Sequence, residues 1–178
     1  MLRTVLIFGV LAGLIVAIPM NILLLIFPHG EGGGHLTGYT LMIVALSFIF
    51  VGVKRYRDRA LGGAIKFVPA LLTGLGISAV AGVIYVVAWE VSLAMTDYAF
   101  MNDYAQAAIE AERAKGVSGA ALDAYIAQME AFKLQYANPL FRLPMTFIEI
   151  FPVGLLISLI SAALLRNPRF LPHTRRVA

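Results

Sequence analysis

The sequence predicts an all-α integral membrane protein, in which four helices form a membrane bundle and a helical hairpin stands outside it. The composition is 60% hydrophobic and only 13% charged, whereas charged residues make up about a quarter of a typical soluble domain. Long runs without charge recur along the chain and are separated by short charged segments. We therefore expect a single membrane domain over residues 1–178, with the lipid bilayer as its main partner.

The first two spans are expected over residues 5–27 and 36–53. The first is a run without charge, long enough to cross a hydrocarbon core of about 30 Å at about 1.5 Å per residue. It lacks the small-residue cleavage site of a signal peptide, so we interpret it as a retained span. A glycine-rich turn follows it, and Tyr39 would anchor the second span at the outer interface. The basic segment that begins at Lys54 ends that span.

The third and fourth spans are expected over residues 67–95 and 143–165. Between them, charged residues are scattered through an alanine-rich stretch at 97–137, where apolar residues recur at helical spacing. Two glycines, Gly116 and Gly119, divide this stretch into two parts. This pattern predicts a helical hairpin outside the membrane. Its aromatic stripe would either hold the two helices together or form a docking surface.

The distribution of positive charge predicts the orientation in the membrane. Ten of the 14 Lys and Arg residues fall in short segments on one side of the spans: Arg3, Lys54, Arg55, Arg57, Arg59, Lys66, Arg166, Arg169, Arg175 and Arg176. The positive-inside rule therefore places both termini in the cytoplasm and the hairpin outside. Because these basic residues are topology signals, the net charge of +4 does not imply binding to nucleic acid.

Polar side chains inside the spans are the main candidates for a binding site. Asn21 and Glu149 are expected at one depth in the outer half of the membrane, with Glu90 and Arg142 nearer the outer surface. An ionisable group near the bilayer centre costs roughly 2.5 to 3.5 kcal/mol and normally has a partner or a role. We hypothesise an outward-facing cavity in which Glu149, Glu90 and Asn21 bind a cation, a proton or a polar substrate. In the structural alternative, Glu149 pairs with Arg142 or bonds a neighbouring helix, and Glu90 marks the membrane boundary.

Other candidate sites are weaker. His29, Glu31 and His35 could in principle supply three ligands to a metal ion, but their spacing fits no rigid template, so we expect neither a metal nor another cofactor. The sequence contains no cysteine and no signature of a catalytic triad or of a zinc hydrolase. A non-enzymatic role is therefore favoured. An enzyme would have to use Glu149 and Glu90 as acid and base on a lipid-linked substrate.

Small-residue ridges occur in two spans. Gly9, Gly13 and Ala17 recur at every fourth position of the first span, as do Gly74, Ser78 and Gly82 in the third. Such ridges allow helices to approach closely, either within one chain or between two copies.

The end of the chain resembles a known family. The segments that carry the resemblance are residues 138–142, Asn-Pro-Leu-Phe-Arg, and residues 147–155, Phe-Ile-Glu-Ile-Phe-Pro-Val-Gly-Leu. Together with shorter segments in the second and third spans, they resemble the bacterial four-span membrane proteins called domain of unknown function 4199. The likeness covers nearly the whole chain. It implies a location in the bacterial cytoplasmic (inner) membrane, and it implies no activity.

The sequence favours a non-enzymatic inner-membrane protein that self-associates or belongs to an envelope protein complex, and that contacts a partner through its outer hairpin. One alternative is a small proton- or cation-coupled transporter that uses Glu149. Another is a lipid-modifying membrane enzyme.

Overall fold

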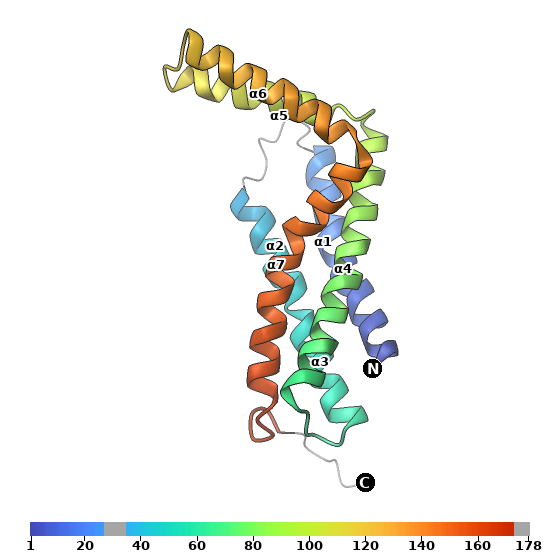
Figure 1. Ribbon diagram of the computed structural model, residues 1–178. Helices are drawn as coiled ribbons and strands as arrows, with labels where there is room; N and C mark the ends of the chain where they lie inside the picture. Colours follow the sequence, from blue (N-terminus) through green and yellow to red (C-terminus); the bar gives the residue numbers. More distant parts are fainter. Residues whose placement is uncertain (27–34, 173–178) are drawn as a thin grey trace.

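The computed structural model describes residues 1–26 and 35–172, and its regular structure there is entirely helical, which confirms the all-α prediction. The helices are α1 (Leu2–Ile26), α2 (His35–Leu46), α3 (Phe48–Ala60), α4 (Phe67–Met95), α5 (Phe100–Ala114), α6 (Ala120–Ala137) and α7 (Pro139–Leu165). Helices α1 to α4 and α7 form an elongated helical body, and α5 and α6 form a crosswise pair at one end of it (Figure 1).

Among the described residues, four helical segments are long and apolar enough to cross a membrane: Leu2–Ile22, Gly38–Ala60, Phe67–Met95 and Pro139–Leu165. They follow the order of the expected spans and support the prediction of a membrane protein. Apolar side chains also cover the outside of the helical body, where Leu6, Val83, Val87, Ile148 and Leu156 are exposed. Helices that are apolar all round suit a lipid environment.

Two of these segments extend beyond the expected limits. The second span is expected to end at Val53, and helix α3 itself continues seven residues further, to Ala60. Its basic residues support the helix, because Lys54 bonds Asp58 one turn further on, at 2.5 Å. The fourth segment begins at Pro139, where proline is tolerated in the first helical turn. The Asn138 side chain caps this helix by accepting a hydrogen bond from the Leu140 N–H at 3.0 Å.

Helix α1 packs against α4 through its small-residue ridge. A Cβ atom added to Gly9 would lie 2.5 Å from the Val80 Cβ, and one added to Gly13 would lie 2.6 Å from the Ile84 Cβ. These distances leave no room for side chains. The ridge in the first span therefore allows close contact between two helices of the same chain.

Helix α7 packs along another side of α4, also through small residues. A Cβ atom on Gly74 would lie 2.9 Å from the Ser158 Cβ, and one on Gly82 would lie 2.6 Å from Phe147. Gly154 of α7 faces Ser78 of α4 in the same way. The second ridge is thus also used within the chain, and α4 forms the centre of the helical body.

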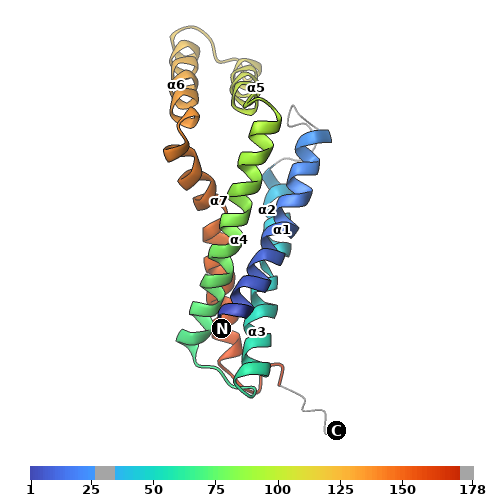
Figure 2. The ribbon, with the colours of Figure 1, turned by 90° about the vertical axis from the view of Figure 1, so that its right-hand side faces the viewer.

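The chain turns sharply between α4 and α5. Asp97 and Tyr98 adopt positive φ angles of 49° and 57°, a conformation that side chains other than glycine rarely take. The Tyr98 N–H bonds the Leu93 carbonyl at 2.8 Å and fixes the turn. Figures 1 and 2 show that α5 and α6 lie side by side across the end of the helical body, far from the start of α1 and the end of α7.

A small second core fills the base of the crosswise pair. Leu93, Met101 and Tyr136 are buried there, and Trp89 and Phe132 pack against them. At the other end of the pair, Gly116 and Gly119 have φ angles of +87° and +60° and allow the chain to reverse. The base of the pair is thus packed onto the ends of α4 and α7.

Candidate functional site

The junction between the helical body and the crosswise pair contains an almost completely buried arginine. Arg142, in the second turn of α7, is only 3% exposed. Its Nε and Nη2 atoms donate to the two carboxylate oxygens of Glu90 in α4, each at 2.7 Å. Two parallel, charge-assisted hydrogen bonds of this kind are a strong and directional form of ion pair.

The third nitrogen of the same guanidinium group holds the end of α6. Arg142 Nη1 donates to the carbonyl oxygens of Tyr136 at 3.0 Å and Ala137 at 3.4 Å. The last carbonyls of a helix have no partner within the helix, so Arg142 satisfies them. The rings of Tyr98 and Tyr136 lie 5.3 Å and 5.7 Å from its guanidinium carbon. We call Arg142, Glu90 and these two carbonyls the Arg142 clamp.

A second polar contact links α4 to α6 beside the clamp. The Trp89 indole N–H donates to the Tyr136 hydroxyl at 2.8 Å. Burial raises the pKa of Tyr136, because a phenolate would be poorly solvated there. The neutral hydroxyl is therefore the stable form at physiological pH.

Asn21 joins α1 to α4 in a separate contact. The Ser92 hydroxyl donates to the Asn21 side-chain carbonyl, and the Asn21 amide donates to the Ala17 carbonyl at 2.9 Å. Ser92 and Glu90 are two positions apart in a helix and therefore point in different directions. Asn21 thus contacts a different face of α4 from the one that holds Arg142.

Glu149 lies on an exposed face of α7, and its carboxylate accepts a hydrogen bond from the buried Tyr85 hydroxyl at 3.4 Å. The structure therefore distributes the four predicted site residues over three contacts. Arg142 pairs with Glu90, Asn21 bonds Ser92, and Glu149 bonds Tyr85. Arg142 does have a carboxylate partner, but it is Glu90 of α4 rather than Glu149 of its own helix.

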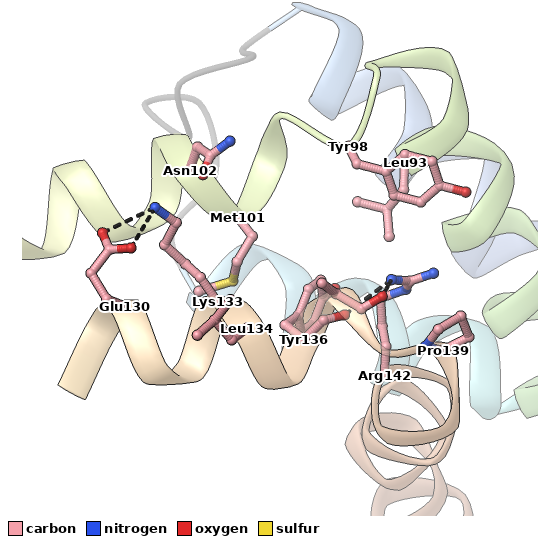
Figure 3. A pocket seen from close by; sticks show the side chains of 11 residues that line it. Leu93, Tyr98, Met101, Asn102, Glu130, Lys133, Leu134, Tyr136, Pro139 and Arg142 are labelled. Atoms are coloured by element: carbon pink, nitrogen blue, oxygen red, sulfur yellow. Dashed lines mark hydrogen bonds and ion pairs between the residues drawn. The ribbon is translucent and has the colours of Figure 1, made fainter. Parts of the chain in front are cut away.

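A cavity of about 540 Å³ lies between α5, α6 and the start of α7 (Figure 3). Arg142 lines it, whereas Glu90, Asn21 and Glu149 are not among its lining residues. The suggested metal ligands His29 and Glu31 lie outside the described residues, as does the side chain of His35.

A second buried arginine, at the opposite end of the helical body, was not anticipated from the sequence. Arg57 is fully buried in α3, and its Nε donates to Asp58 at 2.7 Å. Its other nitrogens donate to the carbonyls of Phe170 at 2.9 Å and Leu171 at 2.5 Å, so it holds the chain beyond α7 against α3. One signal was present in the sequence, because Asp58 is the only acidic residue in the basic segment 54–66.

Together these features define a class: within the described residues the protein is all-helical, with four helical segments long and apolar enough to cross a membrane, and a partly buried ion pair fixes an appended helix pair. The chain belongs to the family described as "Protein of unknown function (DUF4199)", whose model matches residues 7–167. This confirms the family resemblance seen in the sequence. No curated protein and no solved structure matches the chain.

Proposed function

We propose that this protein is a non-enzymatic component of the bacterial inner membrane that binds an envelope partner through its outer hairpin, α5 and α6. Both termini would lie in the cytoplasm, as the distribution of Lys and Arg predicts. The observation that carries the proposal is the Arg142 clamp, which fixes the hairpin across the end of the helical body.

Holding the hairpin with a buried arginine and a strained turn costs free energy. This cost suggests that the orientation of the hairpin matters for its function. A buried arginine loses its hydration, and a paired carboxylate recovers that loss only with good geometry. Asp97 and Tyr98 also hold unfavourable backbone conformations at the turn into α5. A surface already held in its binding orientation loses less entropy when a partner binds.

The hairpin also carries exposed side chains suited to contact. Tyr104 of α5 is 46% exposed and Leu134 of α6 is 78% exposed, and the hairpin also carries exposed charged residues such as Glu110 and Arg113. Aromatic and large aliphatic side chains with polar neighbours are typical of protein interfaces. Glu90 and Arg142, in contrast, are occupied with each other, which supports a positioning role over acid–base chemistry.

Site-specific photo-crosslinking in living cells tests the proposal. A photoreactive residue at Tyr104 should give a discrete protein adduct, and the same residue at lipid-facing Val83 should not. Introducing Arg142→Met should weaken the Tyr104 adduct, because the hairpin is then no longer held in position. Adducts of equal strength with and without Arg142, or only lipid adducts at Tyr104, would refute partner binding by the fixed hairpin.

Glu149 supports a second candidate, a proton- or cation-coupled transporter, because it places a carboxylate next to a phenol within a helix of spanning length. The substitution Glu149→Gln separates the two functions. An interaction protein should keep its Tyr104 adduct. A transporter should stay folded but lose uptake of its ion by proteoliposomes.

A further inference from the structure

The cavity at the base of the hairpin lies where a lipid headgroup would be found. Leu93 comes from the last turn of α4, and Pro139 and Arg142 come from the first turns of α7. Both helices are long enough to cross a membrane, so their neighbouring ends would lie at the bilayer surface. The volume of about 540 Å³ is within the usual range for ligand pockets.

The lining is amphipathic, as a site for a lipid requires. Leu93, Met101 and Leu134 contribute apolar surface, and Leu134 is 78% exposed. Asn102 of α5 and Lys133 of α6 contribute polar groups (Figure 3). A headgroup could therefore contact the polar side chains while the glycerol and first methylenes contact the apolar ones.

The charges of the lining include one cation and one anion that are available to a ligand. The charge of Arg142 is balanced by Glu90. Lys133 and Glu130 form an ion pair, with Lys133 Nζ 3.0 and 3.1 Å from the carboxylate oxygens, and both side chains are partly exposed. A solvent-accessible ion pair of this kind contributes about 0 to 1 kcal/mol to the stability of the fold. A ligand that carries both charges can therefore replace it at little cost.

We propose that this cavity binds the headgroup of a zwitterionic phospholipid with a primary ammonium group, of the phosphatidylethanolamine type. The phosphate pairs with Lys133, and the ammonium donates hydrogen bonds to Glu130 and the Asn102 side-chain carbonyl. A purely anionic headgroup is disfavoured, because it has no ammonium group to balance the charge of Glu130 once its phosphate pairs with Lys133. A quaternary choline group is disfavoured, because it has no N–H to donate to these acceptors.

Native mass spectrometry of the full-length protein, released from vesicles with equal amounts of phosphatidylethanolamine, phosphatidylglycerol and phosphatidylcholine, tests this proposal. The protein should retain phosphatidylethanolamine in clear preference to the other two. The double variant Glu130→Ala/Lys133→Ala should lose about tenfold in that retention, as expected when a charge-assisted hydrogen bond is lost. The matched control is Glu112→Ala/Lys115→Ala, which removes a similar pair outside the cavity and should retain the lipid like the wild type.

A second variant fills the cavity without removing charge. Asn102 is exposed and lines the cavity, so Asn102→Trp should reduce retention while circular dichroism shows an unchanged helix content. Soluble phosphoethanolamine and inorganic phosphate distinguish a lipid from a free ligand, and neither should bind comparably in lipid-free detergent. Equal retention of all three lipids, unchanged retention in the double variant, or equal binding of inorganic phosphate would each overturn the proposal.

Discussion

At the scale of single residues, the structure uses two arginines to connect segments that are distant in sequence. Arg142 joins α7 to α4 and to the end of α6, and Arg57 joins α3 to the chain that follows α7. Arginine suits this role, because its planar guanidinium group can bind a carboxylate and backbone carbonyls at once. Both residues are almost fully buried, so losing either should cost more than losing a surface charge.

We expect Arg142→Met to loosen the crosswise pair. The substitution leaves the Glu90 carboxylate, which is 25% exposed, and two carbonyls without their donor. The free energy of unfolding should fall by about 1 to 3 kcal/mol. Limited proteolysis in detergent should then cleave α5 and α6 faster than in the wild type. Lys115→Ala, which removes an exposed ion pair, should cause no change. Adding Glu90→Leu to Arg142→Met should recover part of the loss, and no recovery would argue against the unpaired charge as its cause.

Arg57→Met should release the chain beyond α7. Hydrogen exchange measured by mass spectrometry should accelerate in the peptide that contains Phe170 and Leu171, because their carbonyls lose the arginine that holds them. Arg59 lies two positions away and is exposed, so Arg59→Met serves as the control. Equal exchange in the two variants would contradict the proposed anchoring role.

At the scale of helices, close approach at glycine decides how α1, α4 and α7 pack. A glycine in one helix lets side chains of the other, such as Val80 and Phe147, approach its backbone, which increases van der Waals contact between the helices. The contacts of Gly13 and Gly154 both lie within the chain. These ridges are therefore unavailable for pairing two copies unless the helical body first separates.

Gly154→Ala should destabilise the α4–α7 contact. The new Cβ atom would overlap the Ser78 hydroxyl and lie 2.8 Å from its Cβ, and overpacking of this kind costs about 1 to 3 kcal/mol. The midpoint of thermal unfolding in detergent should fall, and Ser78→Gly in the same chain should restore it. Gly38→Ala is the control, because among the described residues its Cβ atom would meet only the end of Met20, at 4.0 Å. A normal midpoint for Gly154→Ala alone would contradict this packing.

At the scale of the whole molecule, the distribution of charge and the crosswise pair make one prediction about topology. The end of the helical body that carries the basic segment 54–66 should face the cytoplasm, and the crosswise pair at the other end should face outward. Residues near Ala120 and Arg59 would then lie on opposite sides of the membrane.

Cysteine labelling tests this topology without background, since the natural chain contains no cysteine. A membrane-impermeant maleimide should label Ala120→Cys in cells whose outer membrane alone is permeable. Arg59→Cys should react only after the inner membrane is also opened. Labelling of both positions under the first condition would refute the orientation and the headgroup site that depends on it.

The helices could be predicted from the sequence because their signals are local. A run of apolar residues without charge, such as residues 67–89, is long enough to cross a bilayer regardless of its neighbours, so composition alone identifies it. Helix ends were harder to predict. The second span is expected to end at Val53, and the helix itself continues beyond it to Ala60, because Lys54 and Asp58 form a pair within the helix.

The sequence by itself determined the helical class, the order of the apolar segments and the family, and it singled out Asn21, Glu90, Arg142 and Glu149 as candidate site residues. Only the tertiary structure decided their partners: Arg142 bonds Glu90 and the end of α6, and Asn21 bonds Ser92. The physical reason is that hydropathy depends on each segment alone. A hydrogen bond depends on the rotation and offset of two helices, which are set by side-chain packing along the whole length of α4.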